Sequence, residues 1–260
     1  MPRMLSDVYW IFWREMRRFA RQKSRIAVSI VQPVVWLVLM GSNMAGLTRN
    51  PIGAKMLGTS SYLTFMTPGI MVMTALFGGV FGGTSVIWDR RLGILNKMLA
   101  APISRASVPL GKLLAMMVQN WVQVVMILLI AVIMGVRIAT GLGGVLFLVL
   151  MASLFGMIMG SISLSLAARL KSIETLFAIT NFLTMPLMFT SSAIFPIRAM
   201  PPWLQAIARV NPLSYAVTPM RTVATQGWLW GQIWPGALMT AALAIVAVLF
   251  TIRQFQRGVV

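Results

Sequence analysis

Long apolar stretches separated by short basic segments form the dominant pattern of the chain. A helix that crosses a bilayer needs about 20 mostly apolar residues. The stretches that reach this length are residues 26–45, 62–87, 108–134, 145–167, 173–194 and 233–252. The pattern therefore predicts an all-α integral membrane protein with six transmembrane helices, in a single domain that covers residues 1–260.

An amphipathic segment at residues 1–25 precedes the first predicted span. Its apolar side chains recur at helical spacing, at Leu5, Val8, Tyr9, Phe12, Met16 and Phe19. We expect an interfacial helix whose aromatic side chains enter the headgroup boundary while its arginines meet anionic lipid. An ordinary soluble helix is the alternative interpretation.

The connection between the second and third spans, residues 88–105, predicts a short cytoplasmic helix that ends at Pro102. Its apolar side chains also recur at helical spacing, at Leu92, Leu95, Met98 and Leu99. Such a helix suits either a lipid surface or a groove on a partner protein, and the composition leaves both open.

The connection between the fifth and sixth spans, residues 195–230, is long but rich in proline and aromatic residues. Pro201 suits a helix start, and Asn211 with Pro212 interrupts that helix before a second one that runs toward Arg221. We expect two short re-entrant helices that dip into the outer leaflet.

The composition agrees with a lipid environment, because 58% of the 260 residues are hydrophobic and only 10% are charged. The 22 basic and 4 acidic residues give a net charge of +18, which by itself also suits nucleic acid. The basic residues nevertheless gather in short clusters between apolar runs, as in loops that face anionic headgroups. We therefore expect membrane lipid, and no nucleic acid, as a partner.

The distribution of basic residues predicts the orientation of the chain. The side that we assign to the cytoplasm carries Arg14, Arg17, Arg18, Arg21, Lys23, Arg25, Arg90, Arg91, Lys97, Arg105, Arg169, Lys171, Arg253 and Arg257. The opposite side carries Arg49, Lys55, Arg137, Arg198, Arg209 and Arg221. Both termini are therefore expected in the cytoplasm, with the chain in the cell membrane.

The acidic residues argue against two other classes of membrane protein. Asp7, Glu15, Asp89 and Glu174 all fall in cytoplasmic segments or at cytoplasmic span ends under this topology. Ion-coupled secondary transporters usually keep an ionisable residue near the midplane, so this class is disfavoured. A membrane enzyme is disfavoured as well, because the chain has no histidine or cysteine and shows no acid–base constellation.

Small and amide residues interrupt the apolar spans. The small residues form the pairs Gly78/Gly82, Gly79/Gly83 and Gly156/Gly160, which suit close helix packing or, alternatively, a hinge or substrate groove. The amides are Gln119, Asn120, Gln123 and Asn181. They are candidates for the substrate path, and hydrogen bonding between helices is the other interpretation.

Two motif regions point to a known family. The first reads Asp89-Arg90-Arg91-Leu92-Gly93, then Leu99, Pro102-Ile103-Ser104 and Gly111-Lys112. The second reads Phe195-Pro196, Met200-Pro201-Pro202-Trp203-Leu204 and Asn211-Pro212-Leu213-Ser214-Tyr215, and ends at Arg221. In this order among six spans, the two regions resemble the ABC-2 family of type 2 ABC transporter permeases, which includes exporters of drugs and lipid-linked polysaccharides. Asp89 departs from the glutamate more common in the family but keeps its charge.

The resemblance implies the membrane-spanning permease subunit of an ATP-driven exporter, paired with a second permease copy as a homodimer and with two separate ABC ATPase subunits. The segment 88–105 then corresponds to the coupling helix, with Asp89, Arg90, Arg91, Gly93, Leu95 and Met98 as coupling residues. For Arg90 and Arg91, anchoring by the positive-inside rule is the alternative role. The segment 195–230 corresponds to the outer re-entrant hairpin, with Pro196, Pro201, Trp203, Asn211, Pro212, Tyr215 and Arg221.

No cofactor is expected on this chain, and ATP with magnesium is expected on the partner ATPase. The segment most similar to a phosphate-binding loop starts at Ala106 where the motif needs glycine, and Leu113 replaces the serine or threonine that binds magnesium. We expect an amphipathic drug-like or lipid-like substrate, because the candidate path has methionines and amides but no buried charge. A lipid-linked glycan is the alternative substrate.

Overall fold

The computed structural model describes residues 2–49, 57, 59 and 61–257, and this part of the chain is helical without a strand. The long helices are α1 (Pro2–Arg21), α2 (Lys23–Arg49), α4 (Tyr62–Gly82), α7 (Ser107–Ile133), α8 (Gly141–Arg169), α9 (Ile173–Phe189) and α12 (Trp230–Gln256). The shorter ones are α5 (Thr84–Arg91), α6 (Ile94–Ala100), η1 (Ile197–Ala199), α10 (Pro202–Val210) and α11 (Pro212–Thr225). Lys55, assigned above to the outer side, lies outside the described residues.

Within the described residues, 5 helical segments are long and apolar enough to cross a membrane. These segments are Ile26–Met44, Tyr62–Arg91, Ser107–Ile133, Gly141–Arg169 and Trp230–Gln256. The fifth predicted span is shorter than expected, because α9 has 17 residues and ends at Phe189 instead of residue 194. Pro186 lies in its last turn, and the Thr190 hydroxyl donates to the Pro186 carbonyl where the helix gives way to a turn. These five segments fit a multi-pass membrane protein, and α9 is an additional, shorter apolar helix.

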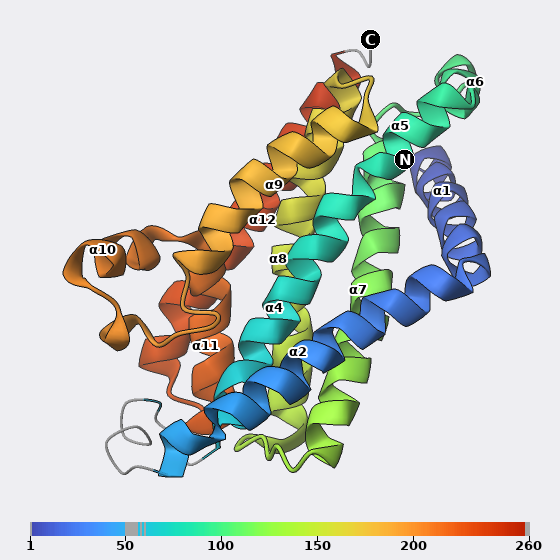
Figure 1. Cartoon of the computed structure of the whole chain (residues 1–260). Coiled ribbons are helices and arrows are strands. Elements are labelled where there is room, and N and C mark those ends of the chain that lie inside the picture. The colour runs from blue at the N-terminus through green and yellow to red at the C-terminus, as the bar shows by residue number, and fades with distance from the viewer. Residues whose placement is uncertain (1, 50–56, 58, 60, 258–260) are drawn as a thin grey trace.

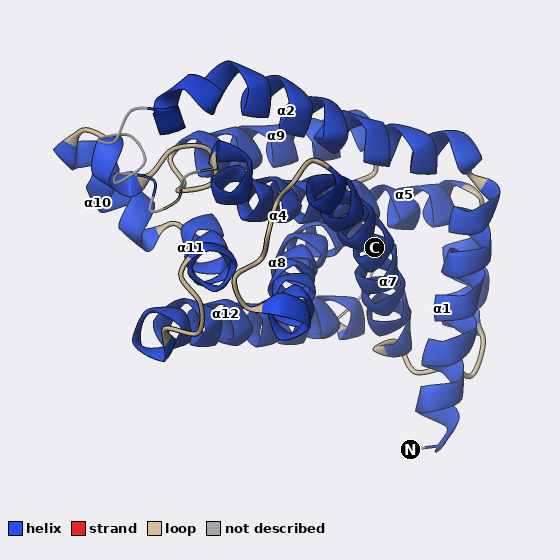
Figure 2. Cartoon of the chain, turned by 90° about the horizontal axis from the view of Figure 1, so that it is seen from below, coloured by secondary structure: helices blue, strands red, loops and turns tan. Residues whose placement is uncertain are grey.

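Helix α8 occupies the centre of the bundle, in contact with α4, α7, α11 and α12 (Figure 2). Leu148, Ala152 and Phe155 on α8 are fully buried. Helix α2 crosses α4 and α7 on one side of the bundle, and only 11% of its most apolar window is buried (Figure 1). The apolar surface of α2 is therefore left mainly for lipid.

Small residues allow the closest approach in the bundle, between α4 and α8. A Cβ atom added at Gly79 would lie 2.7 Å from the backbone nitrogen of Gly160 and 2.9 Å from the carbonyl oxygen of Gly156. The predicted glycine pairs thus include one packing contact made by backbone against backbone. Packing of this kind drives helix association in lipid, where the hydrophobic effect between helices is absent.

We expect Gly79→Ala to lower the free energy of unfolding by about 1–3 kcal/mol, because the added methyl overfills this contact. The measurement is thermal unfolding of the purified protein in mild detergent. Gly231→Ala on α12 is the matched control, since a Cβ atom there would meet nothing within 4 Å. Equal melting temperatures for the two variants would contradict the assigned contact.

Helix α1 packs against α7 with one face. Val8, Ile11 and Phe19 are buried in this contact, and a Cβ atom at Gly111 would lie 2.7 Å from the Ile11 Cβ. Leu5, on the apolar face predicted for a lipid interface, is 73% exposed and takes no part in this packing. The buried face instead includes Ile11 and Glu15, and Glu15 pairs with a buried lysine of α7.

The predicted single helix at residues 88–105 is two helices. Helix α5 ends at Arg91, and α6 begins at Ile94 after Gly93, whose φ of 67° is the left-handed conformation that glycine adopts without strain. The unit of α5 and α6 projects at the end of the bundle where α12 also ends (Figure 1). Pro102 follows α6 and lies beyond its end, as predicted.

The segment 195–230 forms the two predicted helices, α10 and α11, each with a proline at its first position. The Asn211 side chain accepts a hydrogen bond from the Leu213 N–H at 2.8 Å and so caps α11. Both helices lie on one side of the bundle, with α10 farthest from its centre (Figure 1). Their location in the outer leaflet stays a prediction.

Candidate functional sites

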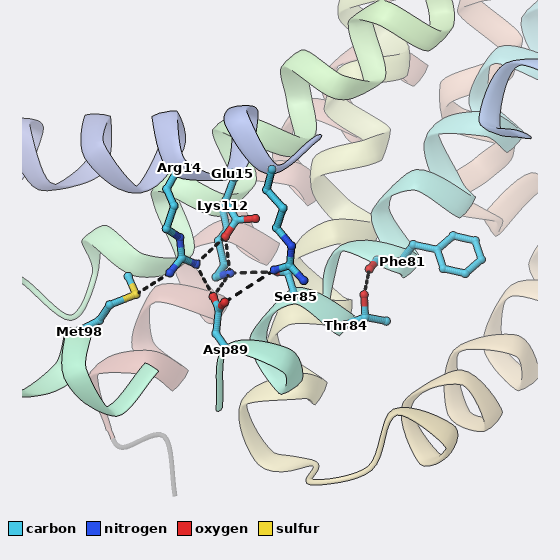
Figure 3. A network of polar contacts seen from close by, with 9 residues as sticks. Arg14, Glu15, Phe81, Thr84, Ser85, Asp89, Met98 and Lys112 are labelled. Atoms are coloured by element: carbon cyan, nitrogen blue, oxygen red, sulfur yellow. Dashed lines mark hydrogen bonds and ion pairs between the residues drawn. The ribbon is translucent and has the colours of Figure 1, made fainter. Parts of the chain in front are cut away.

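A buried charge cluster joins the end of the α4–α5 segment to α1 and α7 (Figure 3). The Lys112 ammonium on α7 donates to Glu15 Oε1 at 2.8 Å, to Asp89 Oδ2 at 2.6 Å and to Ser85 Oγ at 3.1 Å. The side chains of Lys112 and Asp89 are only 1% and 2% exposed. One lysine on α7 is thereby bonded to a carboxylate on α1 and to another on α5.

Two arginines of α1 complete this charge cluster. Arg14 donates to carboxylate oxygens of both Glu15 and Asp89. Arg18 is less closely engaged, with its Nη1 3.7 Å from Asp89 Oδ1. Arg14, Glu15, Arg18, Asp89 and Lys112 are called the charge cluster below. Its three basic and two acidic side chains leave one excess positive charge.

The charge cluster changes the titration of Glu15. Burial by itself raises the pKa of Glu15, but Lys112 and Arg14 outweigh burial and lower that pKa from 4.5 to about 2. Glu15 therefore contributes stability that is present above pH 4.5 and is lost as the pH falls toward 2. At neutral pH the carboxylate is charged and fully available to its partners.

The structure assigns Asp89 and Arg90 to contacts within this chain. The ion pairs of Asp89 go to Arg14 and Arg18 on α1 and to Lys112 on α7, so its carboxylate faces those helices and not the ATPase contact implied by the resemblance. Arg90 turns to the end of α8, where its guanidinium donates to the carbonyl oxygens of Leu170 and Ala168 at 2.7 and 2.6 Å.

The remaining predicted coupling residues divide between inner and outer faces. Leu95 is buried, and the Met98 sulfur accepts a hydrogen bond from Arg14 at 3.5 Å, so both face the bundle. Arg91 is exposed, with its guanidinium 5.8 Å from the centre of the Trp88 ring. Gly93 supplies the bend between α5 and α6.

Sequence reasoning missed the roles of Arg14, Glu15 and Lys112. Lys112 was noted only as part of a motif, although it lies near the start of the third predicted span, where a buried lysine needs a carboxylate partner. With only 4 acidic residues in the chain, few carboxylates could serve as that partner. The pairing itself follows from the fold, because 97 residues separate Glu15 from Lys112.

The candidate path amides have separate environments. Asn120 donates to the Ala152 carbonyl of α8 at 3.1 Å, which is the hydrogen bonding between helices named as one interpretation. Gln119 instead lines a cavity of about 120 Å³, together with the buried charged residues Glu15 and Lys112. The prediction that the candidate path has no buried charge is therefore wrong beside Gln119. Asn181 is exposed on α9 and does not line this cavity.

Gln123, the fourth amide, faces α4. Its Oε1 atom would lie 3.6 Å from a Cβ atom added at Gly78. It therefore lies one turn beyond Gln119 on the side of α7 that meets α4. Of the four amides, the structure brings Gln119 and Gln123 to one face.

Arg221 links α11 to the first turn of α4 and to the turn after α9. Its Nε donates to the Phe65 carbonyl at 3.1 Å, and its Nη2 donates to the Ser192 and Ala193 carbonyls at 2.7 and 3.2 Å. The guanidinium also lies over the Phe65 ring, 3.7 Å from the centroid. Close packing continues here, since a Cβ atom at Gly69 would lie 2.2 Å from the Ala193 carbonyl oxygen.

Asn211 makes a second link to α9. Its Nδ2 donates to the Leu187 carbonyl at 2.8 Å and to the Thr190 hydroxyl at 3.0 Å, while its oxygen caps α11. Pro212 follows as the first residue of α11. The motif residue Asn211 thus joins three segments through one side chain.

The other predicted hairpin residues lie at the surface or beside α12. Trp203 is 66% exposed on α10, and Pro201 is exposed directly before that helix. Pro196 precedes η1. The backbone of Tyr215 approaches α12 closely, since a Cβ atom at Gly236 would lie 2.6 Å from its carbonyl oxygen.

Long apolar helices packed around α8, with the amphipathic α1 and the charge cluster at one end, are those of a multi-pass membrane protein. The family model described as ABC-2 type transporter matches residues 6–224. The chain therefore belongs to the ABC-2 type transporter family.

Several relatives are transport permeases by name. The chain is similar to the transport permease ycf38 of Porphyra purpurea, with 33% identity over 253 residues that cover 92% of this chain and 84% of the relative. It is also similar to the daunorubicin resistance ABC transporter permease protein DrrB1 of Streptomyces coeruleorubidus, with 26% identity over 248 residues, or 94% of this chain and 84% of the relative. A multidrug ABC transporter permease of Escherichia coli K12, YbhR, is 22% identical over 191 residues, or 72% of this chain and 51% of the relative.

Proposed function

We propose that this permease is the membrane subunit of an ATP-driven exporter and that α5 and α6 receive movement from a separate ATPase subunit. The observation that carries the proposal is the charge cluster, because Asp89 connects α5 directly to α1 and α7. A displacement of α5 therefore acts on a helix of the bundle as well as on the N-terminal helix. Neither a membrane enzyme nor a secondary transporter needs this connection.

The exposed face of α5 and α6 supplies the contact with the ATPase in this proposal. Arg91 and Lys97 are exposed, and Leu92 between them is 61% exposed. Such a mixture of an apolar side chain and flanking positive charges suits an acidic groove on a partner. Arg90 has a supporting role, since it holds α5 to the end of α8.

The complete transporter contains two permease copies, as a homodimer, and two ATPase subunits that bind ATP and magnesium. Closure of the ATPases on ATP moves α6, Gly93 allows α6 to change angle, and the charge cluster passes the movement to α1 and α7. A path between the two permease copies then opens outward. Both termini, α5 and α6 lie in the cytoplasm in this arrangement.

An amphipathic, drug-like or lipid-like substrate fits the amide and apolar side chains of the α7 face that carries Gln119 and Gln123. The names of the drug-resistance and multidrug relatives support this substrate class. A lipid-linked glycan is the second candidate, favoured by one observation. Trp228, Trp230 and Trp234 form a row of exposed indoles with successive ring centroids 5.2 and 5.8 Å apart, and such faces stack on sugar rings as well as on headgroups.

The test is co-purification with the ATPase subunit, followed by ATP hydrolysis with and without the permease. We expect Arg91→Ala with Lys97→Ala to reduce the permease-dependent hydrolysis about tenfold while the permease keeps its melting temperature. The matched control is Arg253→Ala with Arg257→Ala, two exposed basic residues on the last turn of α12 and just after it. If Arg91→Ala with Lys97→Ala stimulated ATP hydrolysis as strongly as the wild type, or if the control variant lost as much stimulation, a contact through the exposed face of α5 and α6 would be contradicted.

The substrate class is tested with inside-out vesicles that contain the assembled transporter. ATP-dependent uptake of a fluorescent anthracycline is expected for a drug-like substrate. Absence of uptake from a transporter that hydrolyses ATP normally would move the assignment to the glycan.

A further inference from the structure

A second cavity, of about 530 Å³, opens on the outer face of α1. It is lined by Trp10, Trp13, Arg14, Arg17, Arg18, Arg21 and Gln22. Its lining thus combines two indoles with four guanidinium groups, and none of these described residues is acidic. Arg14 and Arg18 also belong to the charge cluster, whereas Trp10, Trp13, Arg17 and Arg21 lie outside it.

The depth of the cavity relative to the bilayer follows from the chain itself. Helix α1 ends at Arg21, and the first candidate span begins at Ile26, only a few residues later. A span begins where the hydrocarbon begins, so the last turns of α1 lie at the level of the lipid headgroups. Trp10 and Trp13 are 63% and 39% exposed, as expected of indoles in that boundary.

The charge around the cavity is not balanced by the protein. Arg14 is committed to Glu15 and Asp89 through direct hydrogen bonds. Arg18 approaches Asp89 only to 3.7 Å, and Arg17 lies over the Trp13 ring at 5.2 Å. Several guanidinium groups therefore present positive charge to one open cavity, and a guanidinium pairs with a phosphate through two parallel hydrogen bonds.

We propose that this cavity binds the headgroup phosphate of an anionic phospholipid. The acyl chains of that lipid run along the exposed apolar side of α2, where Val28 and Val31 are 64% and 58% exposed. A free phosphate ion would use the guanidinium groups alone, whereas a phospholipid also covers the indoles and the valines. The bound lipid holds the corner between α1 and α2 in the headgroup plane, beside the charge cluster.

The experiment is native mass spectrometry of the permease, titrated in detergent with phosphatidylglycerol or phosphatidylcholine and without ATPase or ATP. We expect the wild type to bind phosphatidylglycerol about tenfold more tightly than phosphatidylcholine. Arg17→Gln with Arg21→Gln should reduce this preference to twofold or less, because these two arginines line the cavity outside the charge cluster. Raising the ionic strength should weaken the preference of the wild type as well.

Arg253→Gln with Arg257→Gln is the matched control, with the same loss of charge at two exposed positions on the last turn of α12 and just after it. It should keep the full preference. A wild type without preference, or an equal loss in the two variants, would overturn the proposed site. Arg17→Lys with Arg21→Lys guards against misfolding and should keep part of the preference. The readout uses no ATP, so its failure leaves the proposed export function untouched.

Discussion

Replacement of Lys112 by methionine is expected to lower the free energy of unfolding by about 3–5 kcal/mol, one of the two largest effects for this permease. Methionine fills a similar volume but leaves the carboxylates of Glu15 and Asp89 in a buried site without their shared ammonium. Arg14 can pair with only part of that negative charge. Thermal unfolding in detergent measures the effect.

Lys97→Met serves as the control for Lys112→Met, because it removes the same charge from an exposed position on α6. Its melting temperature should stay within about a degree or two of the wild type, as surface changes usually cost under about 0.5 kcal/mol. Adding Glu15→Gln to Lys112→Met should restore part of the lost stability, since one uncompensated carboxylate is then removed. Similar melting temperatures for Lys112→Met and Lys97→Met would show that the charge cluster does not hold α1 in place.

Replacement of Arg221 by methionine is expected to cost about 2–4 kcal/mol, because the carbonyls of Phe65, Ser192 and Ala193 lose their shared donor. The loss should be local at first, since these carbonyls connect α11 to α4 and to the turn after α9. Limited proteolysis of the segment between α9 and α11 measures this release, alongside the melting temperature.

Arg137→Met, between α7 and α8, is the matched control for Arg221→Met, because Arg137 is exposed and lies outside the segment whose cleavage is measured. Cleavage of this variant should proceed at the wild-type rate. Arg221→Lys should give an intermediate result, since one ammonium cannot reproduce the planar guanidinium that donates to carbonyls in two directions. If Arg221→Met were cleaved at the wild-type rate, Arg221 would not be the residue that links α11 to α4.

Much of the helical architecture was predictable because lipid imposes a simple length rule on apolar runs. The rule worked for the segment that became α8, where nothing interrupts the helix. It overestimated α9, because the backbone after Phe189 leaves the helix and bonds to α11, with the Ser192 N–H donating to the Ser214 hydroxyl and the Ser192 carbonyl accepting from Arg221. Hydropathy records the environment of a residue and not the partner of its carbonyl.

The candidate sites were predictable to a smaller degree. The motif drew attention to Asp89 and Arg90, but their partners depend on which helices meet at the end of the bundle. Asp89 meets Lys112 on α7, and Arg90 meets backbone carbonyls at the end of α8, which no side-chain pattern can reveal. The same limit hid which face of α1 is buried, since Glu15 lies on that face only because Lys112 is there.

The charge cluster also constrains the order in which this chain can assemble during synthesis. Helix α1 leaves the ribosome before α7, yet Glu15 meets Lys112 only after another 97 residues have been made and the spans of α2 and α4 have been inserted. Until then its arginines and exposed indoles can rest on the membrane surface, which suits an amphipathic helix. Helix α1 is therefore translated before α7 but reaches its final position only once α7 has been inserted.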